Sequence, residues 1–226
     1  MSAPLSIIIP TLNAANRIGP TLACLAETIG EGLIRELIIA DGGSTDAIAD
    51  IADHAGATLV TSSPGRGGQL RAGSAKAKGT WLLFLHADTL LDRAWSAAVI
   101  GHLAQHPKKA AYFKLRFDAV GPWPSLISQW ANLRSQLFHL PYGDQGLLIS
   151  RQHYDAIGGH PDFPMMEDVA IARAIGRQMH ALAATATTSA ERYQRNGWLR
   201  HSLRNHMLML RYCLGTDPEK LAQLYR

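Results

Sequence analysis

Short apolar segments alternate with amphipathic segments along the first 85 residues, and this alternation constrains the fold more than any other feature of the chain. The alternation of strand-like and helix-like segments predicts a mostly parallel sheet with helices on both faces, an α/β fold. In such sheets ligands bind at the carboxyl ends of the strands. We therefore look for chemistry directly after each apolar segment. The apolar segments are 5–9, 36–40, 58–61 and 81–85, and the helical patterns are 17–28, 45–55 and 69–78.

The second half of the sequence is less regular. Its patterns predict strands over 111–117 and 145–150, and helices over 124–138, 167–177 and 198–214. No linker rich in Pro, Gly or Ser separates the halves. We therefore expect one main domain over residues 1–190, with a basic amphipathic helical segment over 191–226 packed on it.

The net charge of +4 is concentrated at one end of the chain. Residues 1–190 contain 15 Lys and Arg and 15 Asp and Glu, whereas residues 191–226 contain seven basic and three acidic residues. The basic segment favours an anionic partner there, either a phosphate-bearing ligand or a membrane surface. An ordinary solvated helix face explains the pattern equally well.

Composition excludes several classes of protein. With 47% hydrophobic and 18% charged residues, the chain is too apolar for intrinsic disorder. Cys24 and Cys213 are too few for a disulfide framework and lie in no zinc-binding cluster, which favours a reducing compartment. We find no signal peptide and no apolar stretch long enough to span a bilayer. The chain is expected to be cytoplasmic, and peripheral to the inner membrane face if the basic segment binds lipid.

The segment after the strand at 81–85 carries a candidate metal ligand. Asp88 follows this strand closely, with His86 two residues earlier. Mg²⁺ and similar ions usually take one or two protein carboxylates and complete their shell with water and substrate phosphates. A capping Asp for a helix near Asp92 is the structural alternative.

The ends of the first two strands are also polar. Pro10-Thr11-Leu12-Asn13 follows the first strand, and Asp41-Gly42-Gly43-Ser44 follows the second, with Ser44 placed to cap the next helix. Glycine before a helix N-terminus suits an anion or a nucleotide ribose. An ordinary turn with a Ser cap is the alternative.

Two further groups of charged residues lie near predicted helix starts. Arg66 and Arg71 flank a glycine-rich turn and could clamp a diphosphate, or could simply be solvated. Glu167 and Asp168 begin a predicted helix between apolar neighbours. Such acids usually stabilise the helix dipole, although an Asp in a crevice can act as a general base.

Taken together and in order, four segments resemble the family 2 glycosyltransferases of the GT-A fold. They are Ser6 to Asn13 (SIIIPTLN), Ile39 to Asp46 (IADGGSTD), Leu82 to Thr89 (LLFLHADT) and Met166 to Val169 (MEDV). The resemblance covers roughly residues 4–177. The segment Gly143 to Gly146 (GDQG), combined with the last two, looks like a bacterial subgroup associated with arsenosugar biosynthesis.

The resemblance implies an activity and a set of roles. It implies a hexosyltransferase-type enzyme that moves a sugar from a nucleotide-diphosphate donor to an acceptor hydroxyl, with inversion and with Mg²⁺ or Mn²⁺ as cofactor. Asp168 matches the family's catalytic base, and Asp88 matches the metal-binding acid of its D-x-D signature. The implied nucleotide-binding residues are Pro10, Thr11, Asn13, Asp41, Arg66, Gln69 and Arg71, and those near the donor sugar or acceptor are Asp144, Gln145 and Glu167.

Three positions depart from the family's patterns. His86 replaces the first acid of D-x-D, Gly42 replaces an acid, and Ala14 stands where an acid often follows Asn13. The region from Arg192 to Trp198 occupies the place of a Q-x-x-R-W element near the phosphates without reproducing it.

The expected partners follow from this activity. They are a nucleotide-sugar donor and an acceptor that is either a small molecule or lipid-linked, with no nucleic acid. The helix at 198–214 would be an interfacial anchor if it presents Arg200, Arg204 and Arg211 to lipid. The sequence leaves the oligomeric state open, a homodimer included.

Two other functions remain open at this point. A non-catalytic nucleotide-sugar-binding protein would tolerate the degraded metal signature. A nucleotidyltransferase shares the α/β layout, but it is expected to carry a glycine-rich phosphate loop after the first strand. This chain has Pro10-Thr11-Leu12-Asn13 there.

Overall fold

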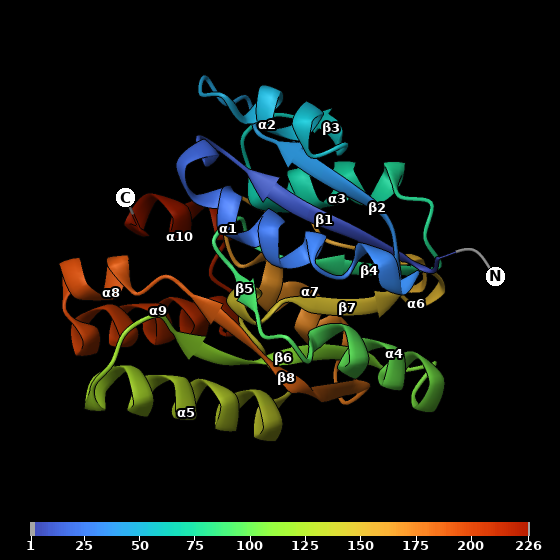
Figure 1. The fold of residues 1–226 in the computed structure, drawn as a ribbon. Helices are drawn as coiled ribbons and strands as arrows, with labels where there is room; N and C mark the ends of the chain where they lie inside the picture. The colour runs from blue at the N-terminus through green and yellow to red at the C-terminus, as the bar shows by residue number, and fades with distance from the viewer. Residues whose placement is uncertain (1–2, 226) are drawn as a thin grey trace.

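A computed structural model describes residues 3–225, and over this range the chain folds around one eight-stranded sheet (Figure 1). The strands are β1 (Leu5–Thr11), β2 (Ile34–Asp41), β3 (Thr58–Thr61), β4 (Trp81–Phe84), β5 (Leu90–Leu91), β6 (Ala110–Phe117), β7 (Leu147–Ser150) and β8 (Met179–Thr188). Their order in the sheet is β3-β2-β1-β4-β7-β6-β8-β5. Strands β3, β2, β1 and β4 are parallel to one another, as β6 is to β8. Strand β7 is antiparallel to both its neighbours, and β5 to β8.

Helices cover both faces of the sheet, as predicted. They are α1 (Ala15–Ala26), α2 (Ile48–His54), α3 (Arg66–Lys76), α4 (Trp95–Gln105), α5 (Pro122–Phe138), α6 (Arg151–Ala156), α7 (Glu167–Ile175), α8 (Glu191–Asn196), α9 (Trp198–Cys213) and α10 (Pro218–Tyr225), with short 3₁₀ turns η1 (Ile29–Glu31) and η2 (Gly143–Gln145). Helices α1, α2 and α4 pack on one face of the sheet, and α3, α6 and α7 pack on the other.

The central strand β1 shows why an uninterrupted apolar run forms a strand here. Successive side chains of a strand point to opposite faces. Ile7 and Ile9 therefore join the core under α1 and α4, whereas Ile8 joins the core under α3 and α7. All three side chains are fully buried, and each such burial contributes roughly 1.5–3 kcal/mol to stability.

Most predicted elements are present, and the exceptions have local reasons. The predicted cap at Ser44 is wrong, because α2 starts at Ile48. Ser44 instead donates a hydrogen bond to the Asp41 carboxylate from its hydroxyl. Strand β8 has no counterpart among the sequence predictions. Its sequence, MHALAATATT, buries small side chains such as Ala184 and Ala186 that give little alternation in hydrophobicity.

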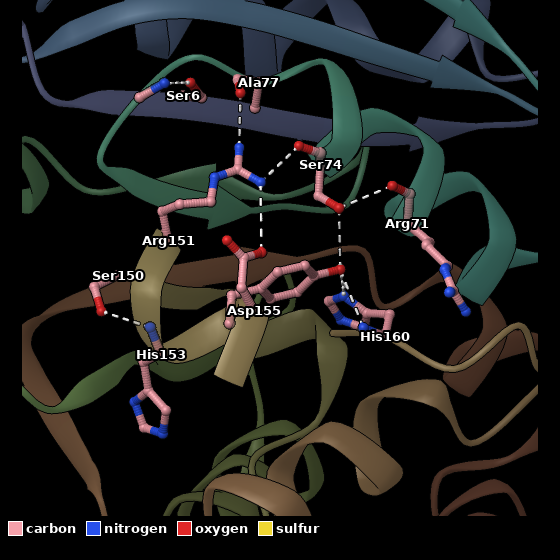
Figure 2. A network of polar contacts seen from close by, with 11 residues as sticks. Ser6, Arg71, Ser74, Ala77, Ser150, Arg151, His153, Asp155 and His160 are labelled. Atoms are coloured by element: carbon pink, nitrogen blue, oxygen red, sulfur yellow. Dashed lines mark hydrogen bonds and ion pairs between the residues drawn. The ribbon is translucent and has the colours of Figure 1, made fainter. Parts of the chain in front are cut away.

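A polar network joins α6 to the C-terminal end of α3 (Figure 2). The Arg151 guanidinium donates to the backbone carbonyls of Ser74 and Ala77, both at 2.8 Å. Ser74 lies in the last turn of α3 and Ala77 directly follows the helix, so both bonds tie α6 to the C-terminal end of α3. The Tyr154 hydroxyl lies 3.2 Å from the Ser74 hydroxyl and 3.1 Å from Nδ1 of His160. The network fixes the segment that leads on toward α7.

Helix α9 packs beside α5, and α8 and α10 contact α9 (Figure 1). Phe117, at the end of β6, packs edge-on against Tyr193 of α8 and Trp198 of α9. Among the residues that the structure describes, no helix has the length and apolar character of a membrane-spanning segment.

Candidate active site

A cleft of about 570 Å³ opens at the carboxyl ends of β1 and β4. One side is formed by the residues after these strands and by the start of α3. The other is formed by η2, the start of α7, and helices α8 and α9. The residues predicted for the site that line it are Pro10, Thr11, Asn13, Arg66, Gln69, Asp88, Asp144, Glu167 and Asp168. The structure therefore brings together nine residues that range from position 10 to position 168 of the chain.

Asp88 is half-buried in the cleft wall, and its carboxylate accepts no hydrogen bond from any residue the structure describes. Its neighbour His86 is engaged instead: Nδ1 lies 2.7 Å from a carboxylate oxygen of Asp144. Burial alone would raise the pKa of Asp144. The hydrogen bond from His86, with the charges of His86, Arg66 and Arg192, outweighs burial and lowers that pKa. Asp144 is therefore ionised near neutral pH.

Asp168 is held by the backbone of η2. The Gly143 N–H donates to Oδ2 of Asp168 at 2.8 Å, while Oδ1 accepts from the N–H of Val169. Gly143 also lies close to His86, because a Cβ added at Gly143 would lie 2.7 Å from Nε2 of that ring. Met166, two residues before Asp168, adopts a left-handed conformation with φ of 67°. Strained backbone of this kind is common at functional sites.

Arg66 stands among four acids. Its guanidinium lies 3.4 Å from Glu167, whose carboxylate is buried. Burial lowers the pKa of Arg66, but the charges of Glu167, Asp168, Asp144 and Asp88 outweigh it and raise the pKa. Burial raises the pKa of Glu167, and Arg66 offsets this only in part. Arg66 thus provides a positive charge close to all four acids of the cleft.

The end of β1 is fixed by contacts across the sheet. The Gln69 amide donates to the backbone carbonyls of Thr11 and Ala40, at 2.6 and 2.9 Å. The Asn13 side chain accepts from the N–H of Thr45 at 3.0 Å. Asn13 itself adopts a left-handed conformation with φ of 50°. The contacts hold the loop after β1 against the loop after β2.

Asp41 lies at the end of β2 but does not line the cleft. Its buried carboxylate accepts hydrogen bonds from Thr11, Gly43 and Ser44. Burial alone would raise the pKa of Asp41, and these hydrogen bonds outweigh it and lower the pKa. Asp41 thus shapes the loop after its strand instead of facing the cleft as the sequence predicts.

Two other predicted residues lie outside the cleft lining. The guanidinium of Arg71 is exposed and points away from the polar network beside it (Figure 2). Gln145 is fully buried. Its amide accepts from the Ser135 hydroxyl and the Tyr142 N–H and donates to the Phe113 carbonyl. Gln145 therefore anchors η2 to β6 and α5 and does not face the cleft.

The sequence patterns did not single out Tyr142 and Arg134. Tyr142 lines the cleft, and Arg134 of α5 lies behind it with its Cζ 3.4 Å from the centre of the Tyr142 ring. Arg134 is 2% exposed, and its Nε and Nη2 atoms have no hydrogen-bond partner in the described part of the chain. The signal was present in the sequence, because Arg134 is the one charged residue of the predicted helix over 124–138.

Helices α8 and α9 also contribute to the cleft. Arg192 and Tyr193 line it, in the region that the resemblance places near the phosphates, and so do four residues of α9. Arg17 of α1 also lines the cleft, and its guanidinium lies 3.9 Å from the carboxylate of Glu191 in α8. The basic C-terminal segment thus supplies a wall of the site.

The donor atoms present suit a hard divalent cation held by few protein ligands. No three His, Cys, Asp or Glu side chains within residues 3–225 are gathered to hold a metal between them. Mg²⁺ binds through one or two carboxylates plus water and phosphates, and the unpartnered carboxylate of Asp88 meets that requirement.

Curated relatives of this chain are glycosyltransferases. The chain is 40% identical over 116 residues to a "PGL/p-HBAD biosynthesis glycosyltransferase" of Mycobacterium tuberculosis and to one of Mycobacterium bovis. The match covers 47% of this chain and 44% of each relative, so the chain shares less than half of the relatives' length.

Solved structures show the same fold. A crystal structure of S. aureus TarS 1–349 in complex with UDP-GlcNAc superimposes with a TM-score of 0.63 at 16% identity, over 82% of this chain and 58% of that chain. Glucosyl-3-phosphoglycerate synthase from Mycobacterium tuberculosis, in complex with Mn²⁺, UDP and glucosyl-3-phosphoglycerate, gives 0.58 at 18% identity, over 83% and 70%. At such identities the likeness establishes the fold, which is the predicted GT-A fold.

The family model described as "Glycosyl transferase family 2" matches residues 6–161. This range includes the ends of β1, β2 and β4, the start of α3, and η2. Because the match spans more than half of the chain, the chain belongs to glycosyltransferase family 2.

Proposed function

We propose that this enzyme transfers a sugar from a nucleoside-diphosphate donor to an acceptor hydroxyl by a single, inverting displacement. One observation carries the proposal: Asp88 and Asp168, 80 residues apart in the sequence, line the same cleft in different environments. The Asp88 carboxylate has no hydrogen-bond partner among the described residues, whereas Asp168 is oriented by the backbone of Gly143. The difference suits one group that binds a cation and another that takes a proton.

Asp168 would act as the general base. Its carboxylate removes the proton of the acceptor hydroxyl while the hydroxyl oxygen forms a bond to the anomeric carbon. The bond from that carbon to the diphosphate oxygen breaks, and its electron pair leaves with the nucleoside diphosphate. The hydrogen bond from Gly143 fixes the carboxylate, which a positioned base requires.

Asp88 would hold a divalent cation, Mg²⁺ or Mn²⁺, against the donor diphosphate. When bound, such an ion neutralises the charge that develops on the leaving diphosphate. Arg66 lies in the same cleft, so its guanidinium can hydrogen-bond the same phosphates. The Mn²⁺ and UDP in glucosyl-3-phosphoglycerate synthase support both assignments, because that enzyme shares the fold.

The donor nucleotide is proposed to be UDP. TarS binds UDP-GlcNAc and glucosyl-3-phosphoglycerate synthase binds UDP, each in the same fold. The Thr11–Asn13 loop and Gln69 would form the nucleoside end of the cleft, with Asp144 and Glu167 nearer the sugar and acceptor. We also propose that residues 191–226 belong to the site rather than forming a separate unit, because α8 and α9 supply one of its walls.

The acceptor is proposed to be a hydroxyl of a small molecule or of a lipid-linked compound. The curated relatives are named for PGL/p-HBAD biosynthesis, and their match covers less than half of their length. They give no support to the arsenosugar-associated subgroup that the sequence motifs suggested.

The proposal is tested by replacing Asp168 with Asn. UDP-sugars are screened with Mn²⁺ for turnover, with hydrolysis of the donor as the readout that needs no known acceptor. A general base contributes roughly 10²–10⁴-fold in rate, so Asp168→Asn should lower turnover by at least about 10²-fold with donor affinity unchanged. Exposed Asp162, which does not line the cleft, provides the control Asp162→Asn. Full activity in Asp168→Asn would remove Asp168 as the base.

A further inference from the structure

The outward side of α5 is apolar and carries no charge. Its exposed side chains include a stripe in which every member is at least 44% exposed. The single charged residue of the helix, Arg134, is buried on the inner side. The stripe consists of Trp123, Leu126, Trp130, Leu133, Leu137 and Phe138. A contiguous apolar surface with exposed tryptophans is uncommon on a soluble monomer and marks an interaction site.

Helix α9 carries a second stripe on its outer side. Leu199, Leu203, Met207 and Leu210 follow the 3–4 residue spacing of one helix face, and each is more than half exposed. The opposite side of α9 packs inward through residues such as Leu208. An amphipathic helix normally points its apolar side to the core. Helix α9 has apolar residues on both sides, so its outer stripe is not needed for packing.

The two stripes form one surface, which we call the α5–α9 face. Figure 1 shows the two helices side by side, and they are in contact. The indole N–H of Trp130 donates to Nε2 of His206 at 2.9 Å and so joins the middle of α5 to the middle of α9. Trp130 belongs to the α5 stripe, so this bond brings that stripe against α9, and no member of either stripe is charged.

Exposed arginines border this face. Arg200 and Arg211 each follow a member of the α9 stripe by one residue, which places both on the same flank of the helix, about 100° from the stripe. Arg204 lies on the same flank but is half-buried. Neither α5 nor α9 contains an acidic residue. The chemistry is that of an apolar surface with a positive margin.

The inner side of α9 forms a wall of the cleft. His201, Asn205, Leu208 and Met209 line the cavity that contains Asp88 and Asp168. A partner bound to the outer side of α9 would therefore be separated from the cleft by the thickness of one helix. Such a position would favour an acceptor delivered from that partner.

We propose that the α5–α9 face docks on the surface of an anionic lipid bilayer. Leucines and tryptophans enter the interface between headgroups and acyl chains, and the basic margin meets anionic headgroups. The pairing of an apolar stripe with arginines and no acid favours this occupant over a second copy of the chain, because the same face of a second copy has no acidic residue on α5 or α9 to pair with the arginines. The docking surface does not depend on the proposed transfer reaction.

The test is co-sedimentation of the full chain with vesicles of phosphatidylcholine alone or mixed with phosphatidylglycerol. The chain should sediment with the anionic vesicles, and binding should fall as salt rises. Arg200→Gln with Arg211→Gln should weaken binding by about thirtyfold, since each basic residue near an anionic surface contributes about 1 kcal/mol. The control is Arg35→Gln with Arg177→Gln, two exposed arginines at the start of β2 and just before β8, at the opposite end of the sheet from the cleft.

A second pair of variants tests the apolar contribution. Leu137→Glu with Leu203→Glu should abolish vesicle binding while the thermal unfolding midpoint stays unchanged, because both side chains are exposed. Ile29→Glu with Ile100→Glu, exposed residues on other elements, should bind like the parent chain. The proposal is overturned if the parent chain ignores anionic vesicles, or if control and test pairs lose binding equally. A dimer that only the Leu→Glu pair dissociates, without vesicle binding, would assign the face to a second copy.

Discussion

The two walls of the cleft are built in different ways. One wall consists of the residues after β1 and β4 and the start of α3, which lie at the ends of parallel strands. The other consists of η2, the start of α7, and helices α8 and α9, which come together from distant parts of the chain. The first wall carries Asp88 with its carboxylate unpartnered, and the second carries Asp168 fixed by a backbone N–H. The comparison suggests that the first wall binds the donor and that the second orients the reacting groups.

The walls meet where α3 contacts the segment before α7. We expect a substitution at that contact to have the largest effect on stability and turnover. A Cβ at Gly67 would lie 2.1 Å from the Pro161 carbonyl oxygen and 2.8 Å from the Phe163 nitrogen. Gly67→Ala should therefore destabilise the protein by about 1–3 kcal/mol and displace the segment that leads to Asp168. Urea unfolding measures the first effect and turnover the second.

The matched control is Gly101→Ala in α4, where an added Cβ meets nothing within 4 Å. Alanine in a helix interior is favoured over glycine, so this variant should be stabilised by about 0.5–1 kcal/mol. If Gly67→Ala behaves like Gly101→Ala, the contact between the walls is not tight.

The two arginines of α3 that the sequence predicts for the site, Arg66 and Arg71, should differ in their effect on UDP binding. Arg66→Gln removes a guanidinium from the cleft, and UDP should bind about tenfold more weakly, as expected for the loss of a charged hydrogen bond. Arg71→Gln changes an exposed side chain outside the cleft, so its effect on UDP affinity should stay within about twofold. Calorimetric titration of UDP measures both. Equal losses would mean that Arg71 reaches the donor.

His160 lies in the segment before α7, which supports the second wall, and it should make the free energy of unfolding depend on pH. Burial lowers the pKa of this imidazole to about 3, so it is neutral in the folded protein, whereas an unfolded His has a pKa near ~6.5. The stabilising contribution is thus fully present above about pH 6.5 and is lost as pH falls toward 3, because the unfolded chain gains a proton.

The expected slope is at most about 1.4 kcal/mol per pH unit in the free energy of unfolding. His160→Phe should reduce this slope, since phenylalanine does not titrate. Urea unfolding at several pH values measures the free energy of unfolding of the parent chain and of the variant. If the two pH profiles are parallel, His160 is not the titrating group.

The sequence predicted the first wall well. Apolar runs fix the strands, and in a parallel sheet their carboxyl ends share one edge, so Asn13 and Asp88 were found by position alone. Asp41 shows the limit of this reasoning. A carboxylate after a strand can face the cleft or bind the N–H groups of its own loop, and the sequence does not distinguish the two.

For the second wall, the residues alone left Glu167 and Asp168 as either helix-dipole acids or a general base, and the basic segment as either a solvated face or a binding site for an anion; the family resemblance supplied the site roles. The contact between Gly143 and Asp168 joins η2 to the first turn of α7, and no periodicity encodes it. Gln145, adjacent to Asp144, points into the core because Ser135 and Phe113 supply its hydrogen-bond partners, which are distant in sequence. Strand β8 escaped detection because its small side chains carry little hydrophobic contrast.

The most direct test of this division of labour is calorimetric titration of UDP, with and without Mn²⁺, into Asp88→Asn and Asp168→Asn. The account predicts that Asp88→Asn loses the gain in UDP affinity that Mn²⁺ provides, whereas Asp168→Asn keeps it in full despite its loss of turnover. If both variants lose that gain to the same extent, or if both retain it, the two carboxylates do not have separate tasks in this cleft.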